Sequence, residues 1–313
     1  MSGRLSCAQP SESFAMEDSF PILAFSDAER AAGAPTPDHV VRAVALFAEH
    51  GALLLRNLFD RDHVERLGRH YRSRYRVELG KPDQADRRRL FTVDVEGPFA
   101  ETRSYANPLL LPILQRLLGA DCILGSCSSV VSWPGAPAQL VRREAASLYG
   151  DYAMDVQLPP YAITLSTPLV RADARTGSTR VWLGTQRVAD FERARAMPSI
   201  APEVEPGSAL ITDARVLLAD EANRSDAIRP LLCNAYHRAW FRERDGAEPR
   251  PQLNLGWRGV AALDPAHRHM LRTADEGSVG SRARWILRRS AARWIPHPLR
   301  ALSARLRRGG GGS

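Results

Sequence analysis

The chain has 313 residues, with 43 basic and 35 acidic side chains that give a formal net charge of +8. Hydrophobic residues make up 44% and charged residues 25%, ordinary values for a globular protein that exclude wholesale disorder. No apolar run approaches the roughly 20 residues of a membrane span, and the N-terminal sequence lacks the basic and apolar regions of a secretory signal.

The positive charge is concentrated in a C-terminal tail. Residues 282–308 carry nine arginines and no acid, so taking nine from +8 leaves about −1 for residues 1–281. A charge held in a tail does not indicate that the main body binds nucleic acid, and no nucleic-acid partner is expected. The apolar spacing of the tail predicts helix. Three roles stay open for it: contact with an anionic membrane surface, binding to an acidic partner, or packing on its own domain.

The four cysteines show no metal-type spacing. Two of them, Cys122 and Cys127, fall in one predicted strand with opposite side-chain directions, which argues against a disulfide between them. This cysteine usage favours a reduced, cytoplasmic location, peripheral to the membrane only if the tail binds there.

Helical patterns dominate the first part of the chain. Residues 1–20 are polar and are expected to be a flexible terminus. Thr36 and Pro37 are typical of an N-cap and a first helical residue, and Gly51 is typical of a helix end. In chain order we predict a helix over 38–50, a strand over 52–55, a helix over 60–71, a strand over 90–95 and a helix over 109–118.

From residue 122 onward, short strands alternate with turns rich in Pro, Gly, Asp and Asn, and no internal repeat is visible. Helices followed by many short strands predict an α+β, mainly β fold, an antiparallel jelly roll buttressed by N-terminal helices. We expect this domain over residues 21–260 and a basic helical segment over 261–308, while residues 309–313 have the composition of a flexible linker. The predicted strands are 123–133, 161–170, 178–183, 208–218 and 231–241.

Seven phrases occur in the order found in one known family. They are Asn107-Pro-Leu-Leu, Ser132-Trp-Pro-Gly, Gln139-Leu-Val-Arg-Arg, Leu169-Val-Arg-Ala-Asp, Thr176-Gly-Ser-Thr-Arg-Val-Trp-Leu-Gly-Thr-Gln-Arg, Pro206-Gly-Ser-Ala-Leu-Ile-Thr-Asp and Asn223-Arg-Ser-Asp-Ala-Ile-Arg-Pro. Over roughly residues 40–245 the chain therefore resembles the phytanoyl-CoA dioxygenase family. The resemblance implies a double-stranded β-helix, a cupin-like jelly roll that normally houses iron(II) and 2-oxoglutarate.

That chemistry uses two histidines and one carboxylate on iron. The family carries His-x-Asp on one strand and a second His about ten residues before an arginine that holds the distal carboxylate of 2-oxoglutarate. The resemblance implies that Val141 and Arg143 stand at the His-x-Asp positions, Ala219 at the second His and Arg229 at the arginine. No histidine lies between residues 71 and 236, so a small register error does not restore the site. We expect no cofactor and no bound iron, while 2-oxoglutarate or another carboxylate stays open.

An arginine at position 143, where the family carries the metal-binding Asp, suggests an anion-binding site. Residues 141 and 143 are two apart on a strand, so both are expected to face the barrel interior. A guanidinium stays charged and matches a carboxylate or phosphate, so Arg143 and Arg229 could bind an anionic small molecule, with Gln139 and Trp182 beside it. The alternatives are that Gln139 is a structural amide, that Trp182 fills the core, and that Arg143 merely pairs with an acid such as Glu144, Asp151 or Asp155.

Two functions remain open. The first is a degenerate pseudo-oxygenase that binds a protein partner, such as an active oxygenase relative, and supports its folding or activity. The second is a metal-independent isomerase, cyclase or lyase acting on a carboxylated small molecule held by Arg143 and Arg229. The excess of arginine over lysine indicates a GC-rich genome and favours a bacterial, specialised-metabolism setting.

Overall fold

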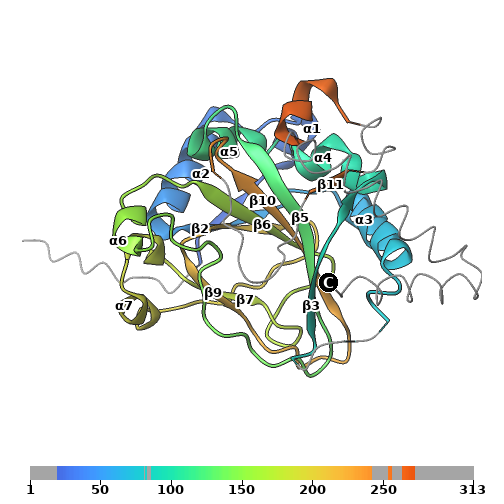
Figure 1. The fold of residues 1–313 in the computed structure, drawn as a ribbon. Coiled ribbons are helices and arrows are strands. Elements are labelled where there is room, and N and C mark those ends of the chain that lie inside the picture. Colours follow the sequence, from blue (N-terminus) through green and yellow to red (C-terminus); the bar gives the residue numbers. More distant parts are fainter. Residues whose placement is uncertain (1–19, 81, 83–85, 242–252, 256–262, 272–313) are drawn as a thin grey trace, which may run out of the picture.

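The computed structural model describes residues 20–80, 82, 86–241, 253–255 and 263–271 (Figure 1). The predicted flexible terminus up to residue 19, the basic tail 282–308 and the linker-like residues 309–313 lie outside the described residues. Within the described ranges, no helix is long and apolar enough to span a bilayer.

A seven-stranded sheet forms the centre of the molecule, in the order β1-β2-β8-β6-β10-β5-β3 (Figure 1). Its neighbours pair antiparallel, except that β1 runs parallel to β2. A smaller sheet pairs β7 (Thr179–Trp182) with β9 (Leu217–Asp220). The strands of the large sheet are β1 (Ile22–Ala24), β2 (Ala52–Arg56), β3 (Arg88–Thr92), β5 (Ile123–Ser132), β6 (Ala162–Pro168), β8 (Ala209–Asp213) and β10 (Arg229–His237).

The two sheets form the double-stranded β-helix, which confirms the predicted fold class. The N-terminal helices cover one face of the large sheet, and β7 and β9 lie on its other side (Figure 1). The helices are α1 (Asp27–Ala32), α2 (Pro37–His50), α3 (Arg61–Arg74), α4 (Thr102–Tyr105), α5 (Leu111–Leu118), α6 (Tyr152–Asp155) and α7 (Phe191–Arg195). Short 3₁₀ helices span Gly97–Ala100, Thr185–Arg187 and Pro265–Leu271, and β4 (Asp94–Val95) pairs with β11 (Asn254–Leu255).

Strand alternation divides the large sheet into an apolar face and a polar face. On β6, Ile163 and Leu165 pack into the main hydrophobic core beneath the helices. The residues between and after them, Thr164 and Ser166, point to the opposite side, because successive side chains of a strand alternate. The helix-covered face therefore holds the core, and the other face lines the interior of the barrel.

The predicted strand over 208–218 is two strands. β8 ends at Asp213 and belongs to the large sheet, while β9 begins at Leu217 and belongs to the small one. The corner between them is stabilised by Asp213, whose Oδ1 accepts hydrogen bonds from the backbone N (2.9 Å) and Nε (2.8 Å) of Arg215. Both strands are buried throughout, so the sequence shows one apolar run where the chain changes sheet.

The N-terminus of α1 depends on one buried carboxylate. Glu29 is 4% exposed and accepts hydrogen bonds from the backbone N of Ser26 (3.0 Å) and of Thr36 (2.8 Å). Burial alone would raise the pKa of Glu29, but these hydrogen bonds outweigh it and lower the pKa from 4.5 to about 2. The ionised carboxylate therefore holds the turn before α1 and the turn before α2 together.

Replacing Glu29 by Gln is expected to lower the free energy of unfolding at pH 7 by about 1–3 kcal/mol, because the amide accepts these bonds more weakly. A depressed pKa stabilises the fold above the unfolded value, so the difference between the two proteins should shrink as the pH falls from 4.5 to about 2. Urea unfolding at several pH values measures this. Glu49→Gln, at a side chain 69% exposed, is the control and should change stability by less than about 0.5 kcal/mol.

Candidate functional site

The wall of the barrel interior that belongs to the large sheet is lined by small polar side chains. Cys233 on β10 lies opposite Ser128 of β5 and Ser166 of β6 in register. The Cys233 sulfur is 4.0 Å from the Ser166 hydroxyl, and burial raises the pKa of its thiol to about 12. This thiol is therefore protonated at neutral pH and is a poor nucleophile.

Residues 139–144 and β9 form the facing wall. Glu144 accepts a hydrogen bond from the Thr164 hydroxyl on the interior face of β6. Arg142 forms a backbone bridge with Leu218, and Leu218 pairs in register with Val181 of β7. Val181 packs in a small apolar cluster with Leu210 of β8, which lies opposite Ser166 on the interior face of the large sheet. By alternation, Arg142, Glu144 and Leu218 all face the interior.

The neighbouring residues face outward. Val141 and Ala219 pack in a small apolar cluster with Trp182 and with Ala194 of α7. Trp182 also donates its indole N–H to the carbonyl of Arg195 (3.1 Å). These contacts place Trp182 in a structural cluster on the outer side of β7, not in the barrel interior.

Arg143 also faces outward, and both of its terminal nitrogens donate to backbone carbonyls, while its Nε has no hydrogen-bond partner. Its Nη1 donates to the carbonyl of Arg215 (2.8 Å) and its Nη2 to that of Val188 (2.6 Å). Its guanidinium lies 4.4 Å from the ring centroid of Tyr152. The prediction that Val141 and Arg143 face the interior is therefore wrong. Their neighbours Arg142 and Glu144 face it instead, because a shift of one residue along a strand exchanges its two faces.

Arg229 stands at the end of the interior and is fully buried. Its Nη2 donates to Asp220 Oδ2 (2.8 Å), and the other Asp220 oxygen accepts from the Thr179 hydroxyl (2.7 Å). Burial would raise the pKa of Asp220, but the charge and hydrogen bond of Arg229 outweigh it and lower that pKa. Arg229 is thus already paired with a carboxylate of this chain.

Gln139 belongs to the same cluster. Its Oε1 accepts from Arg142 Nη1 (2.7 Å) and from the backbone N of Asp220 (3.3 Å). Of the four predicted ligand-binding residues, the structure brings Gln139 and Arg229 together through Asp220, and leaves Arg143 and Trp182 outside. Sequence reasoning missed Arg142, Glu144 and Asp220, although Asp220 lies only nine residues before Arg229.

The space beside Arg229 is small. A cavity of about 10 Å³ borders its side chain and is lined by Ser166, Ser178, Thr179 and apolar residues. Such a volume admits about one water molecule. Among the described residues, no group of three or more His, Cys, Asp or Glu side chains is placed to hold a metal ion.

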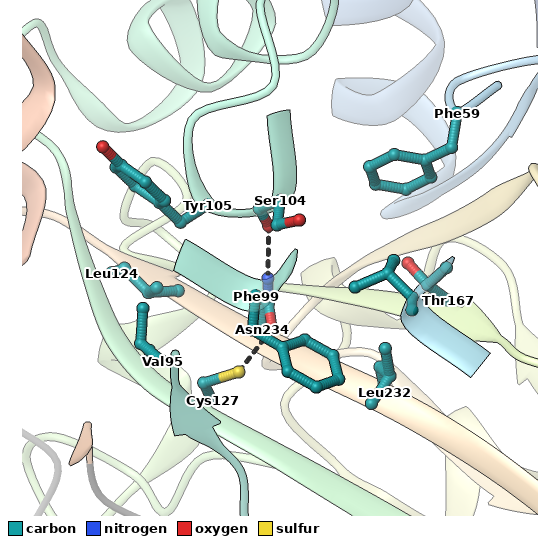
Figure 2. A pocket seen from close by; sticks show the side chains of 11 residues that line it. Phe59, Val95, Phe99, Ser104, Tyr105, Leu124, Cys127, Thr167, Leu232 and Asn234 are labelled. Atoms are coloured by element: carbon teal, nitrogen blue, oxygen red, sulfur yellow. Dashed lines mark hydrogen bonds between the residues drawn. The ribbon is translucent and has the colours of Figure 1, made fainter. Parts of the chain in front are cut away.

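Another cavity, of about 20 Å³, lies on the helix-covered face of the sheet (Figure 2). Its polar member Asn234 is satisfied, since its Nδ2 donates to the Ser104 carbonyl (3.1 Å) and its Oδ1 accepts from the Cys127 thiol (3.2 Å). The Ser104 hydroxyl lies 3.0 Å from His63 Nε2, but it donates to the Pro98 carbonyl (2.7 Å). Apolar walls, satisfied polar groups and the small volume indicate a structural cavity.

No family model matches the chain. Among solved structures, it is similar to SnoN, a non-heme alpha-ketoglutarate-dependent epimerase from nogalamycin biosynthesis, with 16% identity, a TM-score of 0.54, and coverage of 71% of this chain and 95% of SnoN. It is also similar to SnoK, an alpha-ketoglutarate-dependent carbocyclase of the same pathway, with 16% identity, a TM-score of 0.50, and coverage of 71% and 94%. At this identity the likeness shows the fold of the non-heme 2-oxoglutarate-dependent enzymes, not the reaction.

The free energies of unfolding of two variants test whether Arg142 faces the barrel interior and Arg143 faces outward. Arg143→Met removes the part-buried hydrogen bonds to the carbonyls of Arg215 and Val188 and is expected to lower the free energy of unfolding by about 2–4 kcal/mol. Arg142→Met, the adjacent control, removes one hydrogen bond to Gln139 and should cost about 1 kcal/mol. Urea unfolding gives both values, and a larger loss at Arg142 would contradict the orientation described above.

Proposed function

We propose that this chain is a degenerate, phytanoyl-CoA dioxygenase-like pseudo-oxygenase that binds neither iron nor 2-oxoglutarate in its barrel and acts as an auxiliary subunit for a protein partner. The observation that carries the proposal is the identity of the residues facing the interior where the family holds iron. These are Arg142, Glu144 and Leu218.

Iron does not fit this set of side chains. Iron(II) of this enzyme class needs two imidazoles and a carboxylate converging from the two walls. Glu144 is the one potential ligand of the three, Arg142 brings a positive charge, and Leu218 has no donor atom. Asp220 is nearby on β9, but its two oxygens are engaged by Arg229 and Thr179. The chain therefore offers a cation and an aliphatic group in place of the two histidines.

2-Oxoglutarate does not fit either. The family holds its distal carboxylate on the arginine that corresponds to Arg229, yet here Asp220 occupies one side of that guanidinium (2.8 Å). A five-carbon dicarboxylate exceeds the space of about 10 Å³ that remains beside it. The like charge of Asp220 would also oppose a second carboxylate.

The metal-independent enzyme is the weaker hypothesis. It required Arg143 and Arg229 to hold one carboxylated substrate, and Arg143 instead donates to backbone carbonyls on the outer side of the barrel. The interior retains Glu144 as a potential acid or base, but its oxygen is already hydrogen-bonded to Thr164. A barrel whose two cofactor positions are filled by its own side chains is better suited to a scaffold role than to catalysis.

The proposal can be tested by rebuilding the metal site. The wild-type protein, incubated anaerobically with Fe(II) or Co(II) and desalted, is expected to retain no stoichiometric metal. Arg142→His combined with Leu218→His would create His-x-Glu and a facing histidine on the interior walls, and should bind about one metal ion per chain. Metal analysis and the visible absorption of Co(II) measure this.

A matched double variant controls for added histidines. Arg143→His with Ala219→His introduces the same residues one position along, on the outer faces, and should bind no more metal than the wild type. Stoichiometric iron in the wild-type protein would overturn the proposed function. Equal metal binding by both double variants would overturn the assignment of the interior positions.

The auxiliary role predicts a specific partner. Affinity purification of the full chain from its native host should recover, in near-stoichiometric amount, an oxygenase relative that carries both histidines and the carboxylate. Adding the purified chain should raise the activity or the yield of that relative. Recovery of no such relative, together with no effect on its activity, would contradict the role. Repeating the purification without residues 282–308 shows whether the basic tail contributes.

A further inference from the structure

The exposed face of the helix α3 is built from charged side chains. The helix runs along the outside of the molecule (Figure 1). Five of its charged residues are exposed and follow one another at the spacing of three or four residues that places them on one helix face. They are named here the charged face and are Arg61, Asp62, Glu65, Arg69 and Arg72.

The two signs of charge are separated along the charged face. The N-terminal half holds Arg61, Asp62 and Glu65, with a net charge of −1, and the C-terminal half holds Arg69 and Arg72, with a net charge of +2. Glu65 pairs with Arg61 (3.0 Å) and with Arg69 (3.7 Å). Within the described part of the chain, Asp62 and Arg72 form no ion pair.

The neighbouring charges do not remove this separation. A groove of about 780 Å³ adjoins the charged face, and its other charged side chains are Arg30 and Glu205. Arg30 pairs with two aspartates, and Glu205 shares one arginine with two other acids. Arg66 is half-buried and pairs with Glu101 (3.1 Å). The exposed Arg76, just beyond the end of α3, adds a positive charge to the C-terminal side.

A surface that binds the charged face must carry both signs in order. A uniformly acidic surface would meet Asp62 and Glu65, and a uniformly basic surface would meet Arg69 and Arg72. A second α3 that runs antiparallel has the required order. If the twofold axis passes residue 67, Glu65 lies opposite Arg69 of the second copy, because both are two residues from the axis. Asp62 then lies opposite Arg72 of the second copy, five residues from the axis.

We infer that the chain forms a twofold homodimer in which α3 packs antiparallel on α3 of a second copy. Each ion pair then occurs twice, as in every interface of this symmetry. Gly68, beside the axis, carries no side chain, so the second helix can approach closely and enter the groove. Exposed ion pairs are individually weak and are screened by salt, so we expect a Kd of about 0.1–1 mM in low salt. The dimer goes beyond the auxiliary role, and neither depends on the other.

Sedimentation equilibrium of the full chain tests the dimer. The expected result in low salt is a monomer–dimer equilibrium, and the Kd should rise by about tenfold or more when NaCl is raised to about 0.5 M. A protein that stays monomeric in low salt up to about 1 mM would overturn the inference.

Exchanged charges test the antiparallel register. Asp62→Arg or Arg72→Asp places like charges opposite each other, so each variant alone should raise the Kd by about tenfold or more. An equimolar mixture of the two variants pairs opposite charges again at both contacts and should restore the wild-type Kd. All these side chains are exposed, so the variants should keep the fold, which circular dichroism checks.

A second mixture is the matched control. Asp62→Arg mixed with Arg69→Asp contains the same charges, but it leaves arginines opposite each other at positions 62 and 72 and should not restore the Kd. Equal restoration in both mixtures, or restoration in neither, would overturn the antiparallel arrangement.

The outcome is separable from the proposed function. A monomeric wild-type protein would leave the metal analysis and the partner purification unaffected. Stoichiometric iron in the wild-type protein would overturn the auxiliary role without changing the Kd of the dimer.

Discussion

The buried ion pair between Arg229 and Asp220 organises the interior of the barrel. Two charges taken out of water are stable together only if their remaining groups are also paired. Thr179 satisfies the second oxygen of Asp220, and Gln139 joins its backbone to Arg142. The pair thereby ties the large sheet to both segments of the facing wall. It also engages one side of the Arg229 guanidinium, at 2.8 Å, with a carboxylate of this chain.

Apolar packing and hydrogen bonds to backbone carbonyls hold the outer side of the facing wall. Val141 and Ala219 join an apolar cluster beneath α7, and Arg143 fastens the adjoining loop through backbone carbonyls at 2.6 and 2.8 Å. Breaking one of those contacts leaves a part-buried carbonyl without the arginine that donates to it, which costs stability. Arg142 inside the barrel bonds to Gln139 and Arg143 outside it anchors the loop, although the two are adjacent in the sequence.

The parts of the fold that local signals specify were predictable. The helix α2 begins after the Thr36 cap and ends before Gly51, whose φ of 71° favours glycine. The corner between β8 and β9 was not predictable, because both strands are buried on both faces and form one apolar run. Because all four residues of β9 are buried, the sequence pattern of residues 217–220 does not show which of their side chains face the barrel interior. An outer face covered by α7 is as apolar as a core face.

The sequence by itself determined the residue types available to the site: no histidine between residues 71 and 236, an arginine at 229, and arginines at both 142 and 143. Only the tertiary structure decided which of these face one another. A strand has two equivalent faces, and the choice between them depends on what packs against each. Here Thr164 and Arg229 draw Glu144 and Asp220 inward, while α7 and the loop carbonyls hold Val141 and Arg143 outward.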